Sequence, residues 1–251
     1  MLRESALKFK KRKKKLFLFL FKTSKVSKHL TFQATAPDEQ VDVTRTFGPH
    51  VAVKVIPNFA GFVPSSNSPT IKKSGEISLI FLARLHPIKN LDFILRILPV
   101  VSGRIQLSVV GSEEDKSYVA YCHKLIADLP ANIKVELKGE MAYNEVQKEI
   151  KTHQFLILPT QGENFGHSIF EALRAGKPVI ISDQTPWQNL SSNKAGWSLP
   201  LNNPEAFRAI LQQAVDFDQS LYNDWSNGSW NFVREYVRDG NLKKEYEILF
   251  N

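Results

Sequence analysis

The sequence contains a single cysteine, Cys122, among 251 residues. One thiol excludes a disulfide framework and a thiolate-rich metal site. No group of histidine, cysteine and acidic residues has the spacing of metal ligands either, so we expect no metal and no cofactor. Because structural disulfides belong to oxidising compartments, a chain with so little cysteine is assigned by default to the cytoplasm.

Long apolar runs are also missing. The run at residues 16–21 has six apolar residues, fewer than the roughly 7–15 of a signal peptide and far fewer than the ~20 of a membrane-spanning helix. A dinucleotide-binding fingerprint is absent too, because Gly111 is not followed by the second and third glycines of that motif. The sequence therefore predicts no cleaved leader, no membrane span and no NAD-type site.

Positive charge is concentrated at one end. Residues 1–28 hold eleven Lys or Arg and one acidic residue, a balance of +10. Because the whole chain carries +8, residues 29–251 sum to −2. A nucleic-acid-binding function would suit this basic arm, but the near-neutral remainder and the lack of a recognition motif argue against it. We therefore expect no nucleic-acid partner.

Two interpretations of residues 8–28 stay open. In the first, a solvated cationic helix is followed by a core-facing apolar stretch. In the second, the basic and aromatic residues form an interfacial patch that binds the surface of an anionic membrane. The second interpretation would place the protein peripherally at the inner face of the membrane.

The sequence predicts an N-terminal unit followed by a linker. Residues 31–35 and 51–56 are predicted strands. A helix is predicted to begin at Pro37, with acidic residues in its first turn, and to end near Phe47. Residues 64–69 are polar and aperiodic, which is typical of a linker.

From Glu76 onward, predicted strands and helices alternate. The predicted strands are residues 77–82, 105–110, 133–137, 155–158 and 178–181. The predicted helices are residues 90–98, a segment that ends near residue 129, and residues 143–151 and 166–175. The strands are continuous apolar runs, which favours a parallel sheet buried on both faces. The expected fold class is therefore α/β, a Rossmann-like doubly wound parallel sheet that binds ligands beyond the carboxyl ends of its strands.

Residues 159–172 carry the most informative pattern. A strand gives way to a glycine-containing loop and then to a helix, whose first backbone N–H groups form a ready anion site. Glu163 lies in the loop and Glu171 on the helix, with seven residues between them. Taken alone, Glu163 would be a partner of the helix dipole and Glu171 an exposed helical carboxylate.

Together with three further segments, this pattern resembles the retaining GT-B glycosyltransferases of family 4, the group 1 type. The further segments are residues 55–58, 83–90 and 172–180, which occur in the order of that family. The resemblance covers about residues 30–215. It implies the C-terminal, donor-binding half of a GT-B enzyme behind a truncated N-terminal domain.

The resemblance also implies domain boundaries. Residues 1–50 would be a remnant of the N-terminal acceptor domain, 51–75 the interdomain strand and linker, and 76–217 the nucleotide-sugar-binding domain. Residues 218–251 would form C-terminal helices that pack back toward the N-terminal segment. The side chains expected in this contact are Trp230, Phe232, Tyr236, Tyr246, Leu249 and Phe250 on one side, and Phe17, Phe19 and Phe21 on the other.

Roles at the site follow from the matching positions. Glu163 would bind hydroxyls of the transferred sugar, while Arg84 and Lys89 would clamp the diphosphate and stabilise the charge it gains on leaving. Glu171 would hold the ribose of the nucleotide. The other expected donor-binding residues are Asn164, Phe165, Gly166 and Gly111.

Some of these residues also have plainer interpretations. Arg84 taken alone is a surface cation at a strand end. Lys89 lies at a helix start, where a cation opposes the dipole, and a bound anion would resolve that conflict. His86 and His167 are expected to be structural or peripheral, as lone histidines usually are. A histidine that is catalytically important in the family's first domain has no matching context here.

The function that the resemblance implies is transfer of a hexosyl group, with retention, from a UDP- or GDP-linked sugar. The acceptor would be a glycan or a lipid-linked molecule in surface polysaccharide or glycoconjugate synthesis. Two alternatives stay open. One is a non-catalytic nucleotide-sugar-binding subunit, or a truncated product that needs a partner chain supplying the N-terminal domain. The other is a nucleotide-sugar 2-epimerase, which shares the architecture.

Overall fold

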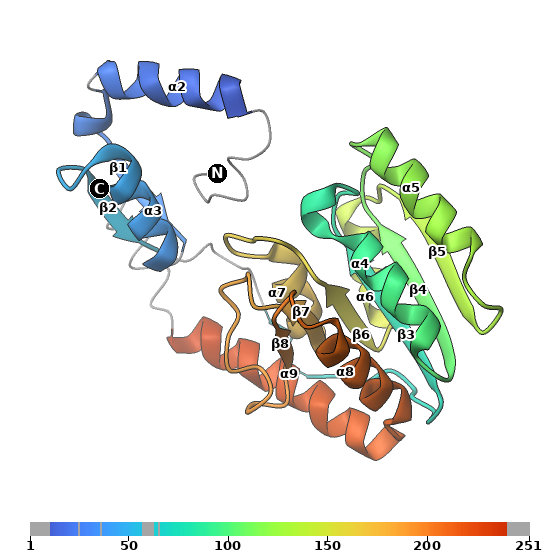
Figure 1. The fold of residues 1–251 in the computed structure, drawn as a ribbon. Coiled ribbons are helices and arrows are strands. Elements are labelled where there is room, and N and C mark those ends of the chain that lie inside the picture. Colours follow the sequence, from blue (N-terminus) through green and yellow to red (C-terminus); the bar gives the residue numbers. More distant parts are fainter. Residues whose placement is uncertain (1–10, 25, 36, 57–62, 65, 240–251) are drawn as a thin grey trace.

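The computed structural model describes residues 11–24, 26–35, 37–56, 63–64 and 66–239, which form a small N-terminal unit and a larger α/β domain (Figure 1). Among these residues, no helix combines the length and the apolar character needed to cross a membrane. The elements of the N-terminal unit are α2 (Lys11–Thr23), η1 (Val26–His29), β1 (Thr31–Ala34), α3 (Pro37–Phe47) and β2 (Ala52–Val55).

The N-terminal unit is built around two parallel strands. β1 pairs with β2, so that Thr31 lies opposite Ala52. The segment before α3 is fixed by Glu39, whose carboxylate accepts from the backbone N–H and the hydroxyl of Thr35, both at 2.8 Å. β2, expected to belong to the connection between domains, is therefore a strand of this unit.

Helix α2 contains the basic residues 11–15 and the apolar run at residues 16–21. The ring of Phe21 meets the ring of Phe47 edge-on, with centroids 5.5 Å apart. Other apolar side chains of the same run point to solvent, since Phe17 is 60% and Phe19 is 63% exposed. The expectation of a core-facing apolar stretch is thus right for Phe21 and wrong for these two rings.

The larger domain has a six-stranded parallel sheet in the order β5-β4-β3-β6-β7-β8. Its strands are β3 (Glu76–Leu82), β4 (Arg104–Val110), β5 (Ile133–Gly139), β6 (Phe155–Leu158), β7 (Val179–Ser182) and β8 (Gly196–Leu199). Every residue of β6 and β7 is buried. The predicted parallel sheet, buried on both faces, is confirmed.

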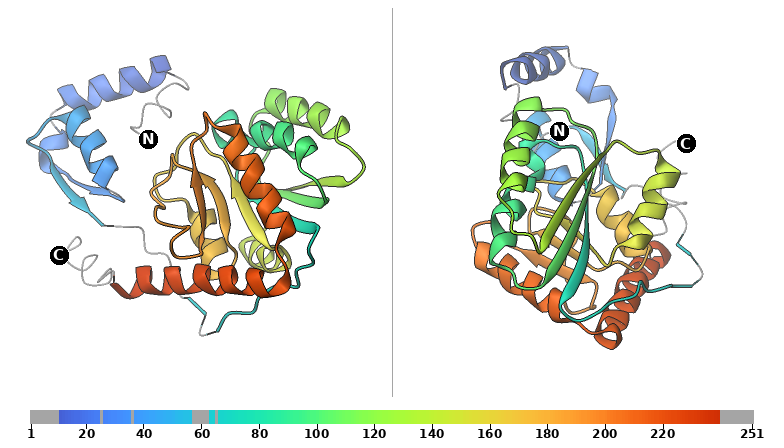
Figure 2. Two further views of the ribbon diagram at one scale, coloured as in Figure 1. Left: turned by 60° about the horizontal axis from the view of Figure 1, so that its bottom comes forward. Right: turned by 90° about the vertical axis from the view of Figure 1, so that its right-hand side faces the viewer.

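Helices cover both faces of this sheet (Figure 2). The helical elements are η2 (Pro87–Lys89), α4 (Leu91–Ile97), η3 (Leu98–Val100), α5 (Lys116–Ala127), α6 (Tyr143–Thr152), α7 (His167–Arg174), α8 (Pro204–Asp216) and α9 (Gln219–Asp239). α4 packs against α5 and α8 on one face, while α7 packs against α6 and α9 on the other. The domain therefore has the three layers of a doubly wound fold.

Strand β8 and helix α8 were not predicted. β8 has four residues and begins at Gly196, where the backbone approaches β7 so closely that a Cβ would lie 2.1 Å from the carbonyl oxygen of Val179. α8 carries ordinary start signals, because the Asn203 side chain accepts from the Ala206 N–H and Pro204 occupies the first turn.

Helix α9 begins at Gln219, at the start of the segment 218–251 that was expected to be helical. Asp218 starts it by accepting from the backbone N–H of Leu221 at 2.8 Å. Gly228 lies mid-helix, where α9 crosses a loop and a Cβ would lie 2.5 Å from the carbonyl oxygen of Asn193. A glycine that is unfavourable in an isolated helix is therefore required by packing here.

The apolar side chains of α9 pack within the larger domain. The ring of Trp187 lies 6.3 Å from that of Phe232 and 5.1 Å from that of Tyr236. The indole N–H of Trp230 donates to the carbonyl oxygen of Pro64 at 3.1 Å. α2 lies far from α9 in both views (Figures 1 and 2). The expected contact of Tyr246, Leu249 and Phe250 with the N-terminal segment lies outside the described residues.

Candidate active site

The loops after β3 and β6 meet at the point where the direction of the sheet reverses. From β3 the chain proceeds outward to β4 and β5, and from β6 it proceeds to β7 and β8 on the other side. The two loops are tied together, because the N–H of Gln161 donates to the carbonyl oxygen of Ile88 at 2.7 Å. Ligands of open α/β sheets bind at such a switch point.

Lys89 and Glu163 form an ion pair across this switch point. The side chains are largely shielded from solvent, with exposed fractions of 12% for Lys89 and 18% for Glu163. Asn90 helps to fix the loop, since it adopts a left-handed backbone conformation and donates to the carbonyl oxygen of Pro159 at 3.1 Å. The structure thus brings together the residues predicted to bind diphosphate and sugar.

His86 shapes the turn that presents Lys89. Its Nδ1 accepts from the backbone N–H of Ile88 at 3.2 Å, which caps η2. Burial, followed by the nearby charge of Arg84, lowers the pKa of His86, so the ring stays neutral near pH 7. The prediction of a structural histidine at this position is confirmed.

Arg84 follows β3 near the same switch point and is exposed to solvent. Its guanidinium is 2.8 Å from the carboxylate of Glu114, and the two side chains are 58% and 43% exposed. Such an exposed pair contributes at most about 1 kcal/mol, so Arg84 can exchange this partner for another anion at small cost.

Gly111 brings the ends of β3 and β4 together. Its φ is 152°, and a Cβ at this position would lie 2.0 Å from the carbonyl oxygen of Ala83. The structure therefore explains glycine here by the close approach of two strand ends. Its expected contact with the donor stays a prediction.

The loop before α7 is anchored on both sides. The N–H of Glu163 donates to the carbonyl oxygen of Gln184 at 3.1 Å. The buried ring of Phe165 meets Trp187, whose indole N–H donates to the carbonyl oxygen of Phe165 at 2.5 Å. Gly166 then caps α7 with a φ of 82°. Because the first N–H groups of a helix lack partners inside it, the start of α7 can offer hydrogen-bond donors to an anion.

Asn164 turns toward the N-terminal unit. Its side-chain amide donates to the carboxylate of Glu39 at 2.8 Å, and its carbonyl oxygen accepts from the hydroxyl of Thr35 at 3.4 Å. The loop that carries Glu163 is thereby joined to the helix α3. Asn164 was expected to bind the donor, and this contact with the N-terminal unit was not predicted.

Glu171 is held by a side-chain network on α6 and α7. Its carboxylate accepts from the amide of Gln147 at 2.7 Å and from the hydroxyl of Tyr143 at 3.3 Å, and lies 2.7 Å from Nε of Arg174. The Glu171 side chain is 16% exposed. The plain interpretation of an exposed helical carboxylate is therefore wrong. Of its partners, Arg174 alone had a sequence signal, the spacing of three residues along a helix.

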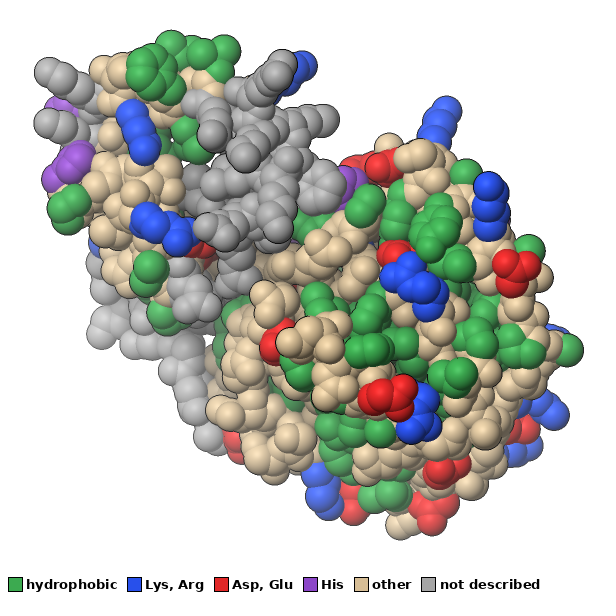
Figure 3. All heavy atoms as spheres, viewed as in Figure 1, with side chains coloured by type: hydrophobic (Ala, Val, Ile, Leu, Met, Phe, Trp, Pro, Cys, Tyr) green, Lys and Arg blue, Asp and Glu red, His purple; other side chains and the backbone are tan. Residues whose placement is uncertain are grey.

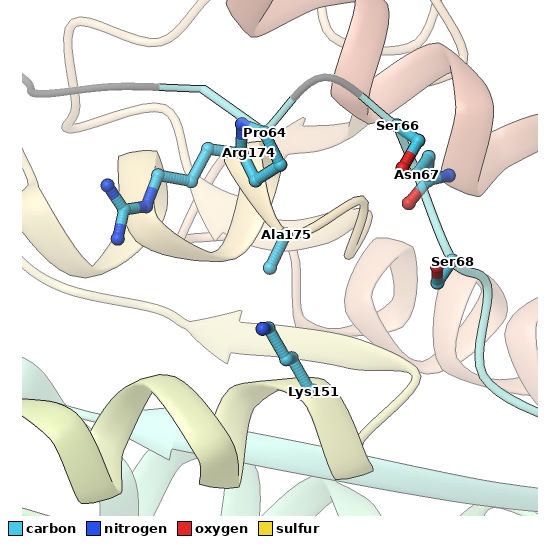
Figure 4. A pocket seen from close by; sticks show the side chains of 7 residues that line it. All are labelled: Pro64, Ser66, Asn67, Ser68, Lys151, Arg174 and Ala175. Carbon is cyan, nitrogen blue, oxygen red and sulfur yellow. The ribbon is translucent and has the colours of Figure 1, made fainter.

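A cavity of about 190 Å³ lies at the other end of α7 (Figure 4). Its lining residues are Pro64, Ser66, Asn67, Ser68, Lys151, Arg174 and Ala175. It opens between the linker and the helices α6 and α7, whereas Lys89 and Glu163 lie at the start of α7. This cavity is therefore separate from the Lys89–Glu163 pair at the switch point.

Comparisons with known proteins show the family of the chain. The family Glycosyl transferases group 1 matches residues 65–230. A poly(ribitol-phosphate) alpha-N-acetylglucosaminyltransferase of Staphylococcus aureus is 25% identical over 222 residues, which are 85% of this chain and 42% of that protein.

Solved structures show the same fold. A variant of S. aureus TarM, in complex with fondaparinux, alpha-GlcNAc-glycerol and UDP, superposes with a TM-score of 0.68 at 18% identity, over 87% of this chain and 43% of that one. Anabaena HepE in complex with UDP-glucose superposes with a TM-score of 0.66 at 16% identity, over 86% of this chain and 62% of that one.

The chain thus spans less than two thirds of each of these relatives and corresponds to the C-terminal half of GT-B structures. The matched segment includes both loops of the switch point and all of α7. Since it covers more than half of the chain, the protein belongs to the glycosyl transferases group 1 family.

Proposed function

We propose that the crevice at the switch point binds a nucleoside diphosphate sugar, and that the chain is the donor-binding part of a retaining hexosyltransferase. The contact between Lys89 and Glu163 beside the first turn of α7 carries this proposal. It places a cation suited to a diphosphate next to a carboxylate suited to sugar hydroxyls. The related Anabaena structure, a complex with UDP-glucose, supports a UDP-linked donor.

The catalytic contribution of these residues is electrostatic. As the bond between the sugar and the diphosphate breaks, negative charge develops on the departing phosphate. Lys89, Arg84 and the N–H groups at the start of α7 stabilise that charge. As in the family it resembles, no residue of this chain is assigned as a nucleophile, and the departing phosphate helps to deprotonate the acceptor on the same face of the sugar.

For the acceptor we propose a glycan or lipid-linked carrier of surface polysaccharide synthesis. The S. aureus relative, whose name gives poly(ribitol phosphate) as its acceptor, supports this class. We further propose that transfer needs an acceptor-binding unit larger than the described N-terminal unit, because relatives with this donor domain are about twice as long. A partner chain is one source of that unit.

We also propose that α2 makes peripheral contact with anionic lipid. Leu16 and Leu20 are 60% and 56% exposed beside Phe17 and Phe19, and the segment is strongly basic. Exposed apolar and cationic side chains together favour an anionic membrane surface. The protein is expected to sediment with phosphatidylglycerol vesicles, while the double variant Phe17→Ser, Phe19→Ser stays in the supernatant. Equal binding of both proteins would refute this contact.

Calorimetric titration with UDP, GDP and their sugar conjugates tests the function. We expect binding of one nucleoside diphosphate and of its sugar conjugate. A folded chain that binds neither nucleotide would refute the proposal. Transfer to added glycan or lipid acceptor is then assayed with labelled donor. Binding without transfer, even after a complementing N-terminal domain is added, would favour the alternative of a non-catalytic subunit. Epimerised sugar released without an acceptor would favour the epimerase.

A further inference from the structure

Resting on the proposed function, we infer that Gln147 and Arg174 are positioning residues that orient Glu171 for the ribose of the donor nucleotide. Both lie outside the residues expected to bind the donor. They hold one oxygen of the Glu171 carboxylate and leave the other as the acceptor for a ribose hydroxyl.

The two oxygens of Glu171 differ in their partners. Oε2 accepts from the amide of Gln147 at 2.7 Å and lies 2.7 Å from Nε of Arg174. Among the described residues, Oε1 has the hydroxyl of Tyr143 as its hydrogen-bond partner, at a longer distance of 3.3 Å. A carboxylate oxygen accepts about two hydrogen bonds. Oε2 is therefore saturated, whereas Oε1 can accept from a ligand.

Arg174 also contacts the two other partners of Glu171, and these contacts fix the orientation of the Gln147 amide. Arg174 donates from Nη2 to Oε1 of Gln147 at 2.7 Å and to the hydroxyl of Tyr143 at 3.0 Å. Because an arginine can only donate, it sets the carbonyl side of the Gln147 amide toward itself and turns the NH₂ toward Glu171. The geometry thus determines which side of Gln147 meets the carboxylate.

The surroundings keep this arrangement stiff. The side chains of Arg174 and Glu171 are only 15% and 16% exposed, so water competes less for their charges than at the rim. Gln147 comes from α6, while Glu171 and Arg174 come from α7. The guanidinium of Arg174 extends away from Lys151 and from the cavity that its stem lines (Figure 4).

Tyr143 is the exchangeable member of the network. Its ring is 60% exposed, and its hydrogen bond to Oε1 is the longest of the three that reach the carboxylate. A ribose hydroxyl that donates to Oε1 therefore replaces the tyrosine hydroxyl without disturbing Oε2. Tyr143→Phe is expected to keep nucleotide affinity within about twofold, since the hydroxyl leaves Oε1 on binding.

Discrimination between ribose and deoxyribose tests the inference. UDP is compared with 2′-deoxy-UDP and 3′-deoxy-UDP by calorimetry, or the guanine series if GDP binds more tightly. The intact chain is expected to prefer the ribonucleotide by about tenfold over at least one deoxy analogue, because the deoxy analogue leaves Oε1 without its donor. Gln147→Met is expected to bring this ratio close to one while the deoxy affinity stays unchanged. Arg174→Lys keeps the positive charge but cannot contact Gln147 and Glu171 at the same time as a guanidinium does. This variant is expected to lower the ratio of ribo- to deoxynucleotide affinity in part.

Controls separate positioning from general damage. Lys148→Met changes an exposed residue on the same helix and is expected to keep the full ratio. If Gln147→Met fails to fold, Arg174→Lys decides alone. An unchanged ribose preference in a folded Gln147→Met or Arg174→Lys variant would overturn the inference, as would an equal loss for ribo- and deoxynucleotides. Absence of any nucleotide binding by the intact chain would instead refute the proposed function.

Discussion

Lys89 and Glu163 contact each other across the switch point of the sheet, where both side chains are largely shielded from solvent. In the proposed complex, Lys89 binds the diphosphate and the Glu163 carboxylate binds hydroxyls of the sugar. Donor binding therefore separates a pair whose charges otherwise neutralise each other. Substitution of Glu163 and substitution of Glu171 are therefore expected to change ligand affinity in different ways.

Glu163→Gln is expected to keep or strengthen the binding of the bare nucleoside diphosphate, because Lys89 loses its competing anion. The same variant should bind nucleotide sugars with less discrimination among them. Glu171→Gln should weaken nucleotide and nucleotide sugar alike, by about tenfold, because it alters a charge-assisted contact to ribose. Calorimetry with both ligand types checks this division, and equal losses in both variants for both ligands would contradict it.

Arg84→Ala is expected to weaken nucleoside diphosphate binding roughly tenfold to hundredfold, since a charge-assisted hydrogen bond contributes about 1.5–3 kcal/mol. The fold should be unaffected, because Arg84 pairs with Glu114 on the exposed rim. Arg104→Ala is a matched control, as its exposed pair with Glu76 lies at the opposite ends of β3 and β4. If both variants bind nucleoside diphosphate with equal affinity, Arg84 does not contact the donor.

Asn164→Ala is expected to leave nucleotide affinity within about twofold, because the side chain is turned to Glu39 and not to the crevice. Its effect should appear in hydrogen exchange, as faster exchange of residues 31–55 when the N-terminal unit loses this tie. A large loss of nucleotide affinity without faster exchange would show that the amide serves the donor instead.

His153 is expected to make folding stability depend on pH. It is buried, its Nδ1 bonds to the carbonyl oxygen of Glu149, and burial is the largest cause of its lowered pKa. Lys138 and Lys177 lower that pKa further, while the Glu149 carboxylate opposes them. The native ring therefore resists the proton that an unfolded histidine binds below about pH 6.5.

Stability should consequently fall as the pH drops through 6.5 toward the native pKa of His153, and be fully present above it. Urea unfolding at pH 7.5 and 5.5 measures the loss, which should be smaller in His153→Gln. His86, whose pKa is also lowered, contributes the same sign in both proteins. An equal or larger loss in the variant would contradict the assignment.

Sequence patterns predicted the parallel sheet and the two loops of the site because their signals are local. Strands buried on both faces are continuous apolar runs, and the loop before α7 carries its own glycines and Glu163, with Glu171 following on the helix. β8 was not predicted, because a strand of four residues that begins at Gly196 shows little hydrophobic pattern. The need for glycine there comes from the close approach of the β7 backbone, which the sequence does not show.

The partners of the site residues could not be predicted for a similar reason. Glu171 meets Gln147 and Asn164 meets Glu39 across separations of 24 and 125 residues. No periodicity along the chain encodes such pairs, which depend on how helices from different parts of the sequence are placed. The roles expected of Glu163 and Lys89, by contrast, are implied by the family resemblance of residues 83–90 and 159–172, whose patterns are local.

The most direct test of the account is a calorimetric titration of UDP, or GDP where that nucleotide is preferred, into the intact chain and into Lys89→Met. Saturable one-to-one binding to the intact chain is expected. The variant should lose at least about tenfold in affinity, because the cation is removed and Glu163 is left to repel the diphosphate. Arg104→Met should bind like the intact chain. Unchanged affinity in a folded Lys89→Met variant would contradict the placement of the donor at the switch point.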